Sequence, residues 1–205
     1  MLLQTVTLLL NTLLLVSAHP LSRPRYALSA SAITTVSPST STCSGAPFPE
    51  ECATASQAAG PISRSFTKYQ ITSSGEQAAL LALMLYESGD FKYSKNHFPG
   101  VPGQGTRNMQ SPAFNLKYAE SLYPAEEVEE AQAQGPEAVL ELVNDDEKGF
   151  ASAAWFLSTQ CTDEIRQGLA SKSAEGWTAY LTQCIGTTDN AERDAYWKKA
   201  VQALE

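Results

Sequence analysis

The chain has 205 residues and a formal net charge of −8 at neutral pH. This acidic balance argues against a nucleic-acid-binding protein, which would present a basic face. Beyond the N-terminal stretch, no segment is long and apolar enough to cross a bilayer, which takes about 20 residues. The composition therefore favours one compact domain with neither a nucleic acid nor a membrane as its partner.

Residues 1–18 have the pattern of a cleavable secretory signal. A short apolar stretch ends in the small residues Val16-Ser17-Ala18, which suit cleavage before His19. The stretch is too short for a membrane span. We therefore expect a secreted, extracellular product.

The stretch from Ala27 to Ser44 consists mostly of Ser, Thr and Ala, with a few isolated apolar residues. Such a composition buries too little apolar surface to become ordered. The sequence therefore predicts a flexible N-terminal segment over 19–61 and one folded domain over 62–205. We expect no separate binding module in the N-terminal segment.

The chain contains four cysteines: Cys43, Cys52, Cys161 and Cys184. An even number in an exported chain indicates two disulfides, for which three pairings exist. Proximity in the sequence favours Cys43–Cys52 and Cys161–Cys184. There is no Cys-x-x-Cys motif, and the only histidines are His19 and His97, so we expect no metal and no cofactor.

The region from residue 62 onward is predicted to be mainly α. Ser73 and Glu76 form a capping-box pattern before the apolar run 78–86. Because this run is apolar on every side, it predicts a buried central helix. Gly89 ends the helix.

Helical spacing and capping residues predict further helices at about 113–122, 125–133, 136–143, 148–160, 162–171, 174–185 and 190–204. Weak alternation from Ile62 to Ile71 favours an extended segment. Between the central helix and the next one, residues 96–110 form a Gly- and Pro-rich loop. Its length is typical of a functional cleft loop.

Glu87 is the main catalytic candidate. It follows nine uncharged residues at the C-terminal end of the predicted buried helix. Desolvation and the negative end of the helix dipole both disfavour the charged form of a carboxyl group there. A protonated carboxyl group can donate a proton to a leaving oxygen. The alternative is a Glu87 side chain that turns outward into solvent.

Two short motifs add to this candidate: the Glu-Ser-Gly segment 87–89, and the loop 103–112, which carries Met109-Gln110 shortly before a proline. This pattern resembles the lysozyme-like superfamily, especially goose-type lysozymes and soluble lytic transglycosylases, and is similar to secreted fungal muramidases. The resemblance implies a lysozyme-like helical domain. It also implies that Glu87 is the general acid and that Ser88, Met109 and Gln110 line a sugar cleft.

The chain also departs from that pattern. Residues 106–108 separate the loop glycine from Met-Gln, and the later Ala-Tyr-Asn motif is reduced to Ala-Tyr-Leu at 179–181. These departures favour hydrolysis over lytic transglycosylation. Asp90, three residues after Glu87, is the candidate second catalytic carboxylate because i and i+3 share a helix face. The alternative for Asp90 is a turn residue.

Four further residues complete the predicted substrate site. Tyr93 and Tyr118 are expected to stack on sugar rings, and Arg107 and Asn108 to hydrogen-bond acetamido or lactyl groups. The alternative for a loop arginine is simple solvation. Three other aromatic residues, Trp155, Trp177 and Trp197, lie on separate predicted helices and are expected in the core.

The sequence thus predicts a secreted, monomeric glycoside hydrolase of the muramidase type that cleaves β-1,4 bonds of bacterial peptidoglycan or a related amino-sugar polymer. Two alternatives stay open: a chitinase- or chitosanase-type hydrolase, and a non-catalytic secreted wall-binding protein of the same fold. Release of sugar ends from purified peptidoglycan distinguishes them.

Overall fold

A computed structural model describes residues 27–205, so the predicted signal at 1–18 lies outside the described residues. Over the described range the chain forms α-helices, a 3-10 turn, a π-helix and two isolated β-bridges, without a named strand. The prediction of a mainly α fold is confirmed. The helices are α1 (Ala30–Val36), α2 (Ala55–Lys68), α3 (Ser74–Glu87), α4 (Pro112–Glu120), α5 (Ala125–Gln134), α6 (Pro136–Val143), α7 (Asp146–Gln160), α8 (Asp163–Ala170), α9 (Ala174–Ala179) and α10 (Ala191–Ala203).

Helix α3 is the buried centre of the fold, as predicted. Ser73 Oγ accepts a hydrogen bond from the backbone N–H of Glu76, which completes the capping box. Every residue from Ala78 to Leu85 is buried. The helix ends at Glu87, and the capping residue Ser88 donates from its Oγ to Met84 O (2.6 Å). Glu87 is therefore the last residue of a helix that runs through the core.

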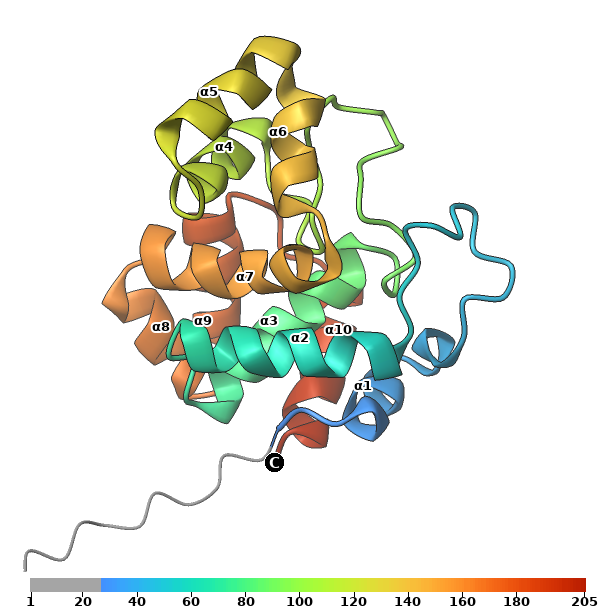
Figure 1. Cartoon of the computed structure of the whole chain (residues 1–205). Helices are drawn as coiled ribbons and strands as arrows, with labels where there is room; N and C mark the ends of the chain where they lie inside the picture. The colour runs from blue at the N-terminus through green and yellow to red at the C-terminus, as the bar shows by residue number, and fades with distance from the viewer. Residues whose placement is uncertain (1–26) are drawn as a thin grey trace, which may run out of the picture.

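The helices form two groups, each with its own buried cluster. Helices α4, α5 and α6 pack on one another above α7, while α1, α2, α3 and α8 to α10 surround the main core (Figure 1). Helix α7 contributes to both clusters: Phe150 and Leu157 belong to the main core, and Trp155 and Phe156 to the smaller cluster. The loop 96–110 leads from the end of α3 toward α4, so it joins the two groups.

Residues 27–61 differ from the predicted flexible segment. Helix α1 presents Ile33 and Val36, both fully buried, to the main core, where α1 packs against α2 and α10. These two residues are three positions apart and therefore share one helix face. The apolar residues that are sparse in the sequence thus gather on one side, and that side is enough to order the segment. The predicted domain start at residue 62 lies inside α2.

The predicted extended segment at 62–71 is also wrong, because most of it belongs to α2. Thr54 and Gln57 form a capping box at the start of this helix. The buried residues Ala58, Ile62 and Phe66 recur every four positions, which is the spacing of one helix face. Pro61 also lies within this helix.

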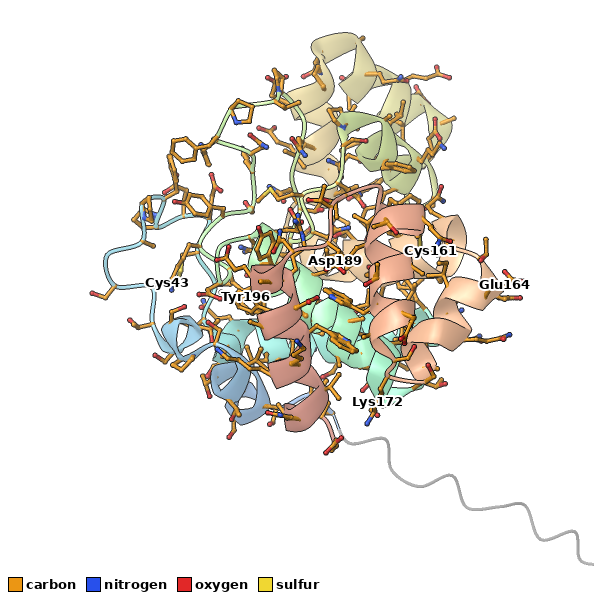
Figure 2. All side chains as sticks on the ribbon, turned by 180° about the vertical axis from the view of Figure 1, so that it is seen from behind. Cys43, Cys161, Glu164, Lys172, Asp189 and Tyr196 are labelled. Carbon is orange, nitrogen blue, oxygen red and sulfur yellow. A yellow bond between two sulfur atoms is a disulfide. The ribbon has the colours of Figure 1, made fainter. Side chains whose placement is uncertain are left out.

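The two disulfides pair cysteines that are near in the sequence, Cys43–Cys52 and Cys161–Cys184, as proximity favoured. Cys43 and Cys161 lie on opposite sides of the molecule (Figure 2). The first disulfide closes a loop before α2, and the second joins the end of α7 to the π-helix Tyr180–Ile185. In the described part of the chain no helix is long and apolar enough to span a membrane.

Candidate functional site

Two pockets meet at Glu87. The first has a volume of about 220 Å³ and the second about 330 Å³, and both are lined by Glu87, Gln104 and Met109. Because these three residues belong to both, the two pockets are adjacent, and we call them together the Glu87 cleft. It lies where the end of α3, the loop before α4, and the start of α10 come together.

Glu87 is paired with an arginine from the far end of the chain. Arg193 Nη2 donates to Glu87 Oε1 at 2.7 Å, and the two side chains are 10% and 20% exposed. The guanidinium also lies over the ring of Tyr86, at 4.2 Å from its centroid, and donates from Nη1 to Thr188 O. Glu87 is therefore not an isolated acid, and the charge opposite it was missed because Arg193 lies 106 residues away.

Short backbone contacts fix the cleft loop. Gly105 forms isolated antiparallel bridges with Lys95 and with Gln110. A Cβ on Gly105 would lie 2.6 Å from Ser94 O, so only glycine fits this approach. Gln110 Nε2 donates to the buried Asn115 Oδ1 at 2.7 Å, which fastens the loop to α4. The polar groups of the loop are thus held in place before a ligand arrives.

Five of the predicted site residues line the cleft. Glu87, Asn108, Met109 and Gln110 line the first pocket, and Tyr93 lines the second. Their roles toward a ligand stay predictions. The structure brings them together from two separate segments, the end of α3 with its following turn and the loop before α4.

Asp90 lies in the turn after α3 and does not line the cleft. Its backbone is left-handed, with φ of 59°. Its carboxylate accepts hydrogen bonds from Ser39 Oγ (2.6 Å) and from Tyr196 OH (2.9 Å), and burial together with this bond raises the pKa of Tyr196. Tyr196 lies on α10, on the side of the molecule that Figure 2 shows. Asp90 thus connects the turn after α3 to Ser39 and to α10. This agrees with the alternative in which Asp90 is a turn residue. Ser88 is fully buried and also serves the turn, since its Oγ accepts from the N–H of Phe91.

Arg107 is buried beneath the cleft loop. Its Nη1 donates to the carbonyl oxygens of Glu51 (2.8 Å), Phe91 and Tyr93 (both 3.2 Å). Burial lowers the pKa of this guanidinium, while Asp146, at 3.3 Å, opposes the shift. Arg107 therefore joins its own loop to Glu51 and to the segment 91–93, and it lines neither pocket.

Tyr118 is likewise fully buried, in the smaller cluster of α4 to α7. Its OH donates to Lys148 O at 3.1 Å, and its ring packs against Trp155. Burial raises the pKa of the Tyr118 phenol. The structure thus places Tyr118, which was expected to stack on a sugar ring, at a core position.

The second pocket has an aromatic wall held from behind by Glu51. The His97 ring is stacked on Phe48 with a centroid distance of 3.7 Å, and its Nε2 pairs with Glu51 Oε1 at 2.7 Å. The other oxygen of this buried carboxylate accepts from the N–H groups of Ser94 and Lys95. The pair fixes the segment 93–97 that lines the pocket.

Other lining residues were not identified from the sequence. The first pocket also contains Gln104, Phe114, Phe156, Ile185, Thr187 and Arg193. Several of them carry apolar side chains on separate helices, where sequence spacing gives no sign of convergence. Within residues 27–205 no group of three His, Cys, Asp or Glu side chains is placed to hold a metal ion.

Comparison with known proteins gives one informative match. The chain is 41% identical over 169 residues to a Fusarium oxysporum protein named bifunctional dioxygenase (DOX)-epoxy alcohol synthase (EAS). The match covers 79% of this chain and 13% of that protein, so the chain spans a small part of its relative. No protein-family model and no solved structure matches the chain.

This match corrects the prediction made from the short motifs. The relative is named for oxygenation and epoxy alcohol synthesis, so membership of the lysozyme-like superfamily, the muramidase function and the glycoside hydrolase class are wrong. The two alternatives that rested on the same resemblance, a chitinase- or chitosanase-type hydrolase and a wall-binding protein of that fold, are wrong for the same reason. The physical reason lies in the motif residues: Ser88 caps a helix, and Met109 occupies a left-handed turn with φ of 49°. Both residues serve local backbone geometry, a helix cap and a turn, which does not specify a reaction.

Proposed function

We propose that the chain is a ligand-binding domain whose Glu87 cleft takes an elongated, largely apolar molecule that carries hydroxyl and epoxide oxygens. The ligand class is an epoxy alcohol, the product class in the name of the 41% identical relative. The observation that carries the proposal is the cleft itself, whose lining combines the Glu87–Arg193 pair with apolar side chains.

The polar side of the cleft suits neutral oxygen groups. Glu87 offers a carboxylate that accepts a hydrogen bond from a hydroxyl, and Gln104, Asn108 and Gln110 bring amide groups. Because Arg193 already balances the charge of Glu87, a neutral ligand leaves the pair intact. A charged ligand would have to compete with that pair.

The apolar side comes from three helical elements. Phe114 on α4, Phe156 on α7 and Ile185 at the end of the π-helix line the first pocket together with Met109. Burying apolar ligand surface here contributes about 25 cal/mol for each Å² removed from water. Affinity then comes from the apolar skeleton, and the placed polar groups set its orientation.

Binding, and not the oxidation step, is the part that these residues support. All four cysteines are in disulfides, and the Nε2 of His97 is held by Glu51. The side-chain donors of the described residues thus do not fit a redox metal. The chain also spans only 13% of the relative, so the activity named for the whole protein is not carried over.

The location of the domain follows from the same chemistry. Two disulfides persist in an oxidising environment and are rare in the cytosol. They support the proposal that the domain works as a secreted, extracellular protein.

Isothermal titration calorimetry of the disulfide-bonded chain with a medium-chain epoxy alcohol tests the proposal. We expect saturable one-to-one binding. Glu87→Gln replaces a charged acceptor by a neutral amide and should weaken binding about tenfold, the equivalent of about 1.4 kcal/mol. The matched control is Glu129→Gln on the exposed face of α5, which should bind like the wild type. Absence of binding, or equal affinity of Glu87→Gln and wild type, would contradict the proposal.

A further inference from the structure

Gln104 occupies the junction of the two pockets. Its side chain lines both of them, next to Glu87 and Met109. Its backbone is fixed on both sides, since its N–H donates to Val101 O (3.1 Å) and its carbonyl accepts from the N–H of Asn96 (3.0 Å). A ligand in either pocket therefore lies against a surface to which this residue contributes.

The orientation of the Gln104 amide is set by its neighbours. Gly100 N–H can only donate, so the atom of Asn96 that it contacts at 2.8 Å is the oxygen, and the other end of that amide is the nitrogen. Asn96 Nδ2 then donates to Gln104 Oε1 at 2.8 Å. At the other end, Gln104 Nε2 donates to the carbonyl oxygen of Met109 at 2.9 Å, and a carbonyl can only accept. Both ends of the chain of bonds give the same assignment.

This assignment leaves a donor at the junction. The amide nitrogen carries two N–H groups, and the bond to Met109 O uses one. Within residues 27–205 the second N–H of the Gln104 amide has no hydrogen-bond partner, and the Gln104 side chain lines both pockets. Glu87 also lines both pockets and supplies an acceptor. A ligand hydroxyl is both donor and acceptor, so it matches this pair: it donates to Glu87 and accepts from Gln104.

We propose that Gln104 is a specificity-determining residue of the Glu87 cleft, whose fixed amide N–H binds the hydroxyl oxygen of the ligand while Glu87 binds the hydroxyl hydrogen. This inference rests on the proposed binding function. It assigns the two halves of hydroxyl recognition to two residues, which can be separated by substitution.

Three probes separate them: a medium-chain epoxy alcohol, its O-methyl ether, and the deoxy analogue without that oxygen. The ether oxygen accepts but cannot donate. Gln104→Met, a substitution of similar volume, should weaken the alcohol and the ether equally, by about three- to tenfold, and leave the deoxy analogue unchanged. Glu87→Gln should weaken the alcohol alone. Gln132→Met, exposed on α5, is the matched control and should bind all three probes like the wild type.

The outcomes distinguish the two proposals. If the wild type binds none of the probes, the proposed binding function is wrong. If the wild type binds the alcohol but Gln104→Met leaves the alcohol and the ether unchanged, the role of Gln104 alone is wrong. The role is also contradicted if Gln104→Met weakens the deoxy analogue as much as the alcohol, since that pattern indicates a displaced loop.

Discussion

Replacing Arg193 by Met removes the charge that faces Glu87 while keeping much of the side-chain volume. The ion pair links the last residue of α3 to the first turn of α10. We expect Arg193→Met to destabilise the fold strongly, because it leaves a largely buried carboxylate without its partner.

The magnitude follows from the burial of the pair. Removing one partner of a buried ion pair costs about 3–5 kcal/mol in the free energy of unfolding. Glu87 keeps 20% exposure, so water relieves part of this cost, and about 2–3 kcal/mol is the expected loss. The same substitution also removes the contact of the guanidinium with the Tyr86 ring and its bond to Thr188 O. For a domain of this size, 1 kcal/mol corresponds to about 2–4 °C in Tm.

Urea denaturation at neutral pH, with circular dichroism as the probe, measures the loss. The matched control is Arg64→Met, which breaks the pair of Arg64 with Glu147, where both side chains are more than half exposed. Such exposed pairs contribute little, so this variant should unfold like the wild type. Adding Glu87→Gln to Arg193→Met should restore part of the lost stability, since no charge is then left unpaired. A loss from Arg193→Met no larger than that from Arg64→Met would refute the reasoning.

Two further predictions concern helix packing and pH. Gly176→Ala should destabilise the fold by about 1–3 kcal/mol, because its Cβ would lie 2.2 Å from the carbonyl oxygen of Gly168 on the packed α8. Urea denaturation measures the loss. The control is Gly60→Ala, where the nearest atom belongs to a flexible arginine, and this variant should be neutral or stabilising. Burial and the Glu87 charge raise the pKa of Tyr180, so above pH about 10 the unfolded state loses this proton first and the free energy of unfolding falls as pH rises. The slope, measured by urea titrations across that range, should be smaller in Tyr180→Phe, and an unchanged slope would contradict the assignment.

Much of the helical fold could be predicted because its signals are local. The capping box at Ser73 and the apolar run after it form as the sequence indicates, and the side chains of Thr162 and Asn190 cap the starts of α8 and α10. Each of these bonds joins residues two to three positions apart, so the sequence contains both partners. The predicted helix over 174–185 is continuous, although its second half is a π-helix.

The N-terminal part could not be predicted in the same way. Leu28, Ile33 and Val36 are few and lie among Ser and Thr, and composition alone makes them too sparse for a core. They become ordered because α2 and α10 supply the opposing surface. That surface is distant in the sequence, so its contribution is a tertiary effect that no local pattern contains.

The site was found in part for a related reason. A carboxyl group that ends a buried helix must emerge at the edge of the core, so the place of Glu87 followed from the apolar run before it. Arg193, which pairs with Glu87, and Phe156, which lines the same pocket, come from helices whose packing no local sequence pattern indicates. Arg107 and Tyr118 are polar or aromatic residues whose burial makes them supports of the cleft.

The motif that led to the wrong reaction lies at the first pocket, and the structure explains why these residues come together there. Ser88 ends α3 immediately after Glu87, and Arg107 anchors the turn that follows to the cleft loop, so these residues create an acid beside a rigid loop. That geometry is what the short pattern encodes. In our proposal, what the cleft binds depends instead on side chains that the motif comparison did not single out: Arg193 pairs with Glu87, Gln104 carries an amide donor, and Phe156 lines the first pocket. A motif of this length therefore identifies a position in the fold, and the surrounding side chains decide what that position binds.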